Sequence, residues 1–203
     1  MNSFDSICQR HMIWIIKYIS KKYSSALYLI WYTDTDKVST DRFLTYKDGT
    51  IFSLLTLNNL ENEIQHERFN LTYPENLRPW LADISKSKVT ESVVYNTDLI
   101  VESFLRGDFS EMNLEHLTNF VNLFDDYVHQ DEKNEGLKVH SEAASIREVW
   151  DYYYDFCFWP KFKMEENKIE KRKLEVDVAE FLKELTGMVE AFDRNISLKK
   201  VDG

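Results

Sequence analysis

The spacing of apolar residues divides the chain into a short N-terminal helical pattern, a strand-rich part at about 26–57 and a helical part at about 58–195. In the first segment, apolar or aromatic side chains recur every three or four positions, and Ser3 is available as an N-cap. These positions are Phe4, Ile7, Cys8, His11, Ile15, Tyr18 and Ile19. The pattern predicts one helix that begins near residue 4 and continues to residue 19.

The strand-rich part centres on a tight turn at Asp48-Gly49. Residues 42–47 and 50–56 flank this turn, and Gly49 can adopt the positive φ that such a turn needs. Residues 26–33 are rich in aromatic and β-branched side chains, which favours a further strand. A fourth strand is predicted at 92–95. We therefore expect a small antiparallel sheet built from hairpins.

The rest of the chain has the 3.6-residue spacing of amphipathic helices. Thr97 is a candidate cap for one of these helices and Gly107 is placed to close it, whereas Pro160 is expected to end another. The predicted helices cover residues 58–66, 74–84, 98–106, 113–128, 145–157 and 174–192. Together with the sheet they predict an α+β fold in a single globular domain, 1–203, with a small N-terminal antiparallel sheet and a larger set of helices.

Composition agrees with an ordinary folded domain inside the cell. Of the 203 residues, 43% are hydrophobic, which is enough for one core, and only five are glycine and three proline. The two cysteines, Cys8 and Cys157, are too few for a disulfide scaffold. The N-terminus lacks the features of an export signal, and no apolar run reaches the roughly 20 residues of a membrane span. We expect a cytoplasmic protein that does not contact membranes.

Negative charge is concentrated in the middle of the chain. Residues 91–157 contain 15 acidic and 4 basic side chains, a net charge of −11, whereas the whole chain has a net charge of −10. The same segment is rich in Trp and Tyr. Acidic groups attract a basic partner and aromatic side chains anchor it, so this composition favours binding of a basic protein and disfavours direct contact with nucleic acid phosphates.

Few residues are arranged for catalysis. Five scattered glycines cannot form a phosphate-binding loop or a dinucleotide fingerprint. Glu63 and His66 have the spacing of a di-iron ligand pair, but the pattern occurs once and those sites need it twice. Cys157 lies among Phe156, Phe158 and Trp159, which favours a buried thiol over a nucleophile. We expect no metal, no cofactor and no enzymatic activity.

One helical face combines the two properties of the acidic segment. Glu148, Tyr152, Asp155 and Trp159 follow one another at spacings of four, three and four, and Asp151 lies beside them. Further carboxylates extend this candidate partner-binding face: Asp125, Asp126, Asp131, Glu132 and Glu135. Two interpretations remain open. Tyr152 and Trp159 either anchor a partner or cover a second, smaller core against residues 161–164.

Several short segments resemble bacterial immunity proteins of contact-dependent growth inhibition and related polymorphic toxin systems. They are FLTYKDG at 43–49, YPENLRPWL at 73–81, LTNFVNLFDD at 117–126 and the stretch from VWDY at 149–152 to Phe158-Trp159. The resemblance covers about residues 26–160, so the N-terminal segment and the last helix lie outside it.

This resemblance implies a cytoplasmic, non-enzymatic inhibitor that binds a cognate toxin domain, commonly a nuclease. It transfers no binding residue, because interfaces vary within the family. We therefore predict an immunity protein that neutralises a basic toxin by stoichiometric binding. A regulatory or scaffold module for another basic protein is the alternative, and an unrecognised enzyme is a further one.

Overall fold

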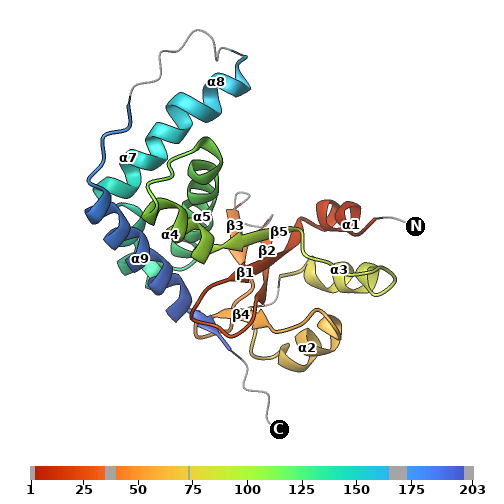
Figure 1. Ribbon diagram of the computed structural model, residues 1–203. Coiled ribbons are helices and arrows are strands. Elements are labelled where there is room, and N and C mark those ends of the chain that lie inside the picture. Colours follow the sequence, from red (N-terminus) through yellow and green to blue (C-terminus); the bar gives the residue numbers. More distant parts are fainter. Residues whose placement is uncertain (1–2, 35–39, 73, 165–172, 199–203) are drawn as a thin grey trace.

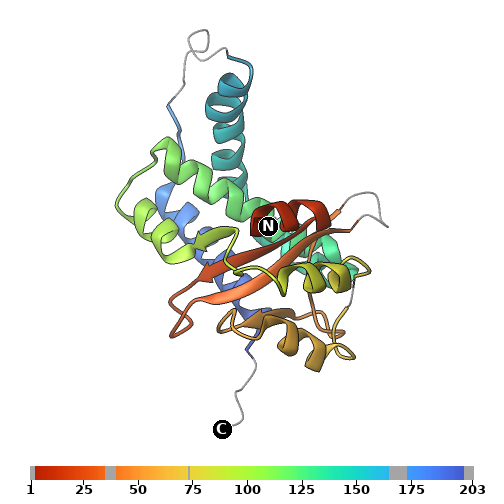
Figure 2. The same ribbon diagram turned by 90° about the vertical axis from the view of Figure 1, so that its right-hand side faces the viewer.

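The computed structural model describes residues 3–34, 40–72, 74–164 and 173–198, and it places a twisted sheet between two groups of helices (Figures 1 and 2). On one face lie α1 (Phe4–His11), α2 (Leu60–Glu67) and α3 (Leu77–Ile84). The elements of the other face are α4 (Thr97–Leu105), α5 (Glu111–Gln130), η1 (Glu132–Leu137), α6 (Lys138–Ser141), α7 (Ala144–Tyr153), η2 (Tyr154–Phe158), α8 (Trp159–Phe162) and α9 (Val178–Arg194).

The sheet confirms the α+β class and contains more kinds of strand pairing than the hairpins alone predict. Its strands are β1 (Ile13–Ile19), β2 (Leu27–Asp34), β3 (Thr40–Phe43), β4 (Ile51–Leu54), β5 (Val93–Asn96) and β6 (Ile196–Ser197). The order is β5-β1-β2-β4-β6, with β3 also paired to β2. β2 runs antiparallel to β1, β3 and β4, whereas β5 joins β1 and β6 joins β4 in parallel. The sheet is therefore mixed.

Each face of the sheet has its own core. The larger core packs sheet residues against α4, α5, α7 and α9, and Phe192 of α9 lies at its centre in contact with five aromatic rings. The smaller core packs the other face against α1, α2 and α3 and contains the fully buried Trp80. Because both faces are covered, β1 and β2 are apolar on both sides.

The predicted turn at Asp48-Gly49 is confirmed. Gly49 has a φ of 95°, the N–H of Tyr46 donates to the carbonyl of Thr50, and Asp48 accepts from the N–H and hydroxyl of Thr50. The hydroxyl of Tyr127 donates to the Gly49 carbonyl at 3.0 Å, which ties the turn to α5.

The predicted N-terminal helix to residue 19 is wrong. Ser3 caps α1 as expected, but the helix ends at His11, and Met12 takes a left-handed conformation with φ 53°. Residues 13–19 then form β1, whose burial on both faces supplies the closely spaced apolar positions that resemble a helix.

Helix ends also differ from the predictions in detail. Asn96, not Thr97, supplies the capping side chain of α4, and α5 begins at Glu111. Gly107 follows α4 with the expected positive φ. The helical path continues through Pro160 into α8. None of the helices in the described ranges is long and apolar enough to cross a membrane.

Candidate protein-binding surface

The helices α7, η2 and α8 join end to end into one helical arm, which extends beyond the body of the molecule (Figure 1). One side of the arm belongs to the larger core, where Ile146, Val149, Tyr153 and Cys157 are buried. Cys157 is 3% exposed, so its thiol is a packing group as the sequence predicted. A second side, with Trp150, Tyr154 and Phe158, is partly buried against the same core, and Asp151, Asp155 and Trp159 are exposed.

The middle of the arm, η2, is a π-helix. The N–H of Trp159 donates to the carbonyl of Tyr154, five residues earlier, which widens the turn. Pro160 lies in the first turn of α8, directly after the wider turn. Proline is tolerated in a first turn, because the N–H that it lacks is not needed there for an i to i−4 hydrogen bond. The arm therefore extends to Phe162 and presents more side chains than a helix that stops before Pro160.

The outward side of the arm carries an acidic ridge, defined here as Glu148, Asp151, Asp155 and Trp159. Asp151 and Asp155 are exposed, Glu148 is half-buried and Trp159 is 43% exposed. Within the described part of the chain, these three carboxylates form no ion pair. The ridge thus combines carboxylates that have no ion-pair partner among the described residues with one large, partly exposed aromatic side chain.

Two aromatic rows flank the ridge. Tyr152 contacts Phe156 at a ring-centroid distance of 5.1 Å and packs partly against the larger core. The second row contacts Trp159 and runs to the end of the arm: Trp150, Tyr154, Phe158 and Phe162. Phe162 is 71% exposed and the neighbouring Met164 is 93% exposed. Tyr152 thus packs against the larger core and not against residues 161–164. Trp159 does contact that segment, through the Phe162 ring and through the Lys163 ammonium 5.9 Å from its ring centroid, and it is still 43% exposed.

The base of the arm is tied to α5 by polar contacts. The Asn122 side chain accepts from Trp150 Nε1 at 2.9 Å and donates to the Tyr154 hydroxyl at 3.0 Å. Arg147 donates to Asp125 at 2.9 Å and lies over the Trp150 ring, 5.4 Å from its centroid. Asp125 is thus already paired with a cation, so its contribution to an acidic interface is smaller than the sequence predicts.

Asp126 faces the sheet instead of the ridge. Its carboxylate accepts from Trp31 Nε1 of β2 at 3.1 Å. Burial raises the pKa of Asp126 to about 7; the bond from Trp31 opposes this shift, and the nearby carboxylates Asp41 and Asp125 add to it. Asp126 therefore lies outside the surface that the ridge forms.

Asp131 and Glu132 lie at the end of α5 that is remote from Trp159. Asp125 pairs with Arg147 at the base of the arm, whereas Glu111 pairs with Lys161 near its tip, so α5 and the arm run antiparallel. Twenty residues of α-helix span about 30 Å. Asp131 also accepts from the N–H of Lys133 and caps η1. The structure brings Glu148, Asp151, Asp155 and Trp159 together and leaves this acidic loop at the far end.

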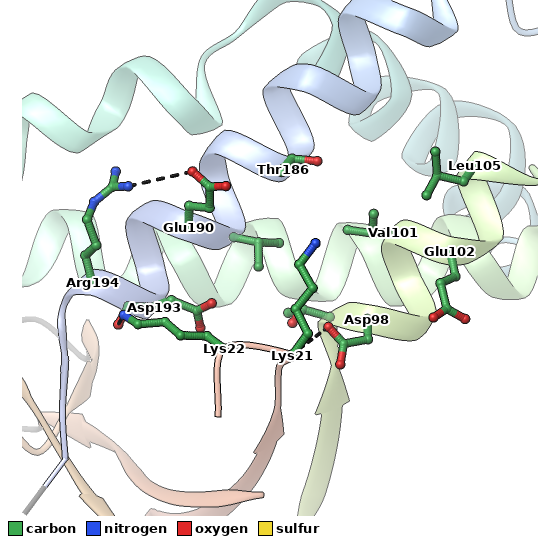
Figure 3. A pocket seen from close by; sticks show the side chains of 12 residues that line it. Lys21, Lys22, Asp98, Val101, Glu102, Leu105, Thr186, Glu190, Asp193 and Arg194 are labelled. Carbon is green, nitrogen blue, oxygen red and sulfur yellow. Dashed lines mark hydrogen bonds and ion pairs between the residues drawn. The ribbon is translucent and has the colours of Figure 1, made fainter. Parts of the chain in front are cut away.

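A separate cleft of about 540 Å³ lies between α4, α9 and the turn that joins β1 to β2 (Figure 3). At its base, the buried carboxylate of Asp193 accepts from the hydroxyls of Tyr18 at 2.8 Å and Ser20 at 2.7 Å. Burial raises the pKa of Asp193, and the two hydroxyl bonds and nearby Lys22 oppose that shift. The apolar spacing of α9 predicts none of this, because the partners are more than 170 positions away in sequence.

Potential metal ligands do not converge in the described ranges, where no group of three or more His, Cys, Asp or Glu side chains could hold a metal ion. The ring of His140 lies against Gly187, where an added Cβ would be 3.5 Å from His140 Nδ1, an ordinary van der Waals distance. The packing of α6 against α9 therefore does not require glycine at position 187.

Comparisons with known proteins support the fold only. No protein-family model matches the chain, and no curated protein matches it significantly. A solved structure described as the SatS C-terminal domain in complex with bromine has a similar fold, with a TM-score of 0.58. The two chains share 14% sequence identity, and the match covers 95% of this chain and 96% of the other. The immunity family that the sequence resembles is not shown by these comparisons and stays a prediction.

Proposed function

We propose that this chain is an immunity protein that binds and neutralises a basic bacterial toxin domain, with the acidic ridge of the helical arm as its contact surface. The observation that carries the proposal is the combination of Asp151 and Asp155, which have no ion pair in the described part of the chain, with the exposed ring of Trp159. A cationic active site would be attracted by the carboxylates and anchored by the indole. Occlusion of that active site is sufficient for inhibition.

The shape of the arm supports this proposal. A projecting helix can enter a concave site, and the flanking aromatic rows exclude water around the charged contacts, which strengthens them. The π segment in its middle adds to the case, because such segments occur frequently at functional sites. Asn122 and Arg147 hold the arm against α5, so little ordering of the backbone is needed on binding.

The experiment uses the protein encoded directly beside this chain's gene, since an immunity gene adjoins its toxin gene. We expect co-expression to restore growth of cells that produce the toxin domain, and calorimetry to measure a one-to-one complex. The double variant Asp151→Lys with Asp155→Lys, and separately Trp159→Ala, should each weaken binding by more than about 1 kcal/mol.

The matched control reverses Glu61 and Glu75, two exposed carboxylates on the side of the sheet that carries α2 and α3. If the neighbouring protein neither harms cells nor binds, the immunity role is wrong. If it binds but the arm variants match the control, the role stands and the contact surface is elsewhere. A regulatory or scaffold protein could use the same ridge, and the absence of a toxin gene beside this one would favour that alternative.

A further inference from the structure

The cleft between α4 and α9 has the dimensions of a small-molecule site. Its volume of about 540 Å³ lies within the range of roughly 300 to 1,000 Å³ that is typical of ligand pockets. Figure 3 shows side chains from both helices and from the β1–β2 turn around one space. Nothing in the proposed toxin contact uses this cleft.

Much of the wall is apolar. Val101 and Leu105 line it from α4 and Val189 lines it from α9. Leu105 is 62% exposed, although it belongs to a helix whose inner face is well packed. Apolar side chains left open to a concave space favour a hydrocarbon ligand, because its burial removes both surfaces from water.

The charged groups at the base and rim are largely satisfied within the protein. Lys22 donates to the backbone carbonyl of Asp193, and the Asp193 carboxylate accepts from two hydroxyls. At the rim, Glu190 pairs with Arg194 at 3.8 Å. The same holds on α4, where Glu102 pairs with Arg106 at 3.7 Å.

Lys21 differs from these groups. Its backbone N–H donates to Asp98, but its ammonium has no hydrogen bond or ion pair to any described residue. The hydroxyl of Thr186 on α9 is likewise without a partner in the described ranges. Figure 3 shows the Lys21 side chain reaching into the space between the two helices, with Thr186 above it. One cation and one hydroxyl donor thus face an apolar wall.

We propose that the α4–α9 cleft binds a small monocarboxylate with an apolar body, whose carboxylate contacts Lys21 and Thr186 and whose hydrocarbon part lies along Val101, Leu105 and Val189. A carboxylate accepts from both donors at once, and the ammonium makes one of these bonds charge-assisted. The proposal is independent of the immunity role, since no ridge residue lines the cleft.

Surrounding charge restricts the ligand to a single negative group. Asp98, Glu102 and Glu190 also line the cleft and would repel a second anionic group. Dicarboxylates, nucleotides and other polyanions are therefore disfavoured. Neutral alcohols of the same length lack the charge that Lys21 requires.

Methyl NMR titration of the full chain tests this with three eight-carbon probes: octanoate, 1-octanol and the dicarboxylate suberate. We expect saturable shifts of the methyl groups of Val101, Leu105 and Val189 with octanoate, and at least about tenfold weaker binding of the other two probes. Lys21→Gln should weaken octanoate binding about tenfold and Thr186→Val about threefold.

Leu105→Ser should also weaken octanoate binding, whereas Lys86→Gln, at an exposed lysine after α3, should leave it unchanged. The proposal is overturned if octanoate causes no saturable shift at these methyl groups. It is also overturned if Lys21→Gln binds octanoate as tightly as Lys86→Gln does, or if octanol matches octanoate, because either result removes the role of the ammonium.

Discussion

Replacement of Asp126 by Asn should stabilise the folded protein at neutral and alkaline pH. The Asp126 carboxylate is half-buried on α5 and accepts a hydrogen bond from Trp31 Nε1 at 3.1 Å. Asparagine keeps an oxygen for this bond and removes the charge that burial disfavours. The usual expectation, that loss of a hydrogen-bonded carboxylate is destabilising, is therefore reversed at this position.

The raised pKa of Asp126 determines how the free energy of unfolding changes with pH. Asp126 has a pKa of about 7 in the folded state against 3.8 for the unperturbed group. Between these values the folded protein holds a proton that the unfolded chain has lost, so the free energy of unfolding falls as pH rises from about 4 to 7. A shift of about three pH units corresponds to at most roughly 4 kcal/mol, and partial solvent screening reduces our expectation to about 2 kcal/mol.

Urea denaturation at pH 5 and at pH 8 measures the effect. Asp126→Asn should exceed the wild type in free energy of unfolding by about 2 kcal/mol at pH 8, with a smaller gain at pH 5. Asp151→Asn is the control, because solvent surrounds that exposed carboxylate. The reasoning is refuted if Asp126→Asn is less stable than the wild type at pH 8, or if its advantage does not grow with pH.

Two further predictions concern packing and the attachment of the arm. Phe192→Ala removes a fully buried ring from the centre of the larger core and should lower the free energy of unfolding by about 3 to 5 kcal/mol. Phe162→Ala, at a ring that is 71% exposed, should change this free energy little. Urea denaturation compares the two variants, and equal effects would contradict the assigned core. Asn122→Ala leaves two aromatic side chains of the arm without their hydrogen bonds to α5. It should lower the free energy of unfolding by about 1 to 2 kcal/mol and accelerate amide hydrogen exchange in α7, whereas Asn119→Ala, at an exposed neighbour, should do neither. Unchanged exchange in α7 would contradict the attachment of the arm through Asn122.

Two local signals, a tight turn and a helix cap, were confirmed at their predicted positions. Asp48-Gly49 and Ser3 act through their own backbone neighbourhood, and both are found as expected. The prediction of a helix at 13–19 was wrong because the periodicity of this segment is ambiguous. A central strand with a core on each face is apolar at successive positions, which include positions three and four apart. The break at Met12 is a left-handed residue that is neither Gly nor Asn, so the sequence contains no usual stop signal.

The part of the candidate site that depends on local properties of the arm could be predicted from the sequence, and the part that depends on contacts between elements could not. Charge and helical phase identify Asp151 and Asp155 as exposed neighbours, since both properties are local to the arm. They cannot show that Asp126 faces Trp31 or that Asp125 meets Arg147, because these contacts join different elements. Asp126 was included in the predicted site because it is next to Asp125 in sequence, but in the structure it contacts Trp31 of β2 and lies outside the ridge.

The aromatic residues of the arm follow a four-residue spacing instead of the 3.6 residues of a regular α-helix turn. Trp150, Tyr154, Phe158 and Phe162 recur at intervals of four, as do Tyr152 and Phe156 between them. At 3.6 residues per turn, each step of four drifts by about 40° around the helix axis, so three steps in a regular helix would carry Phe162 about 120° away from Trp150. The wider turn at η2 offsets part of this drift between Tyr154 and Phe158. Phe158 and Phe162, which follow it at an i, i+4 spacing, stack with ring centroids 6.1 Å apart. The four-residue period fits this widened helix, in which the exposed Trp159 ring lies beside the second aromatic row, in contact with Tyr154, Phe158 and Phe162.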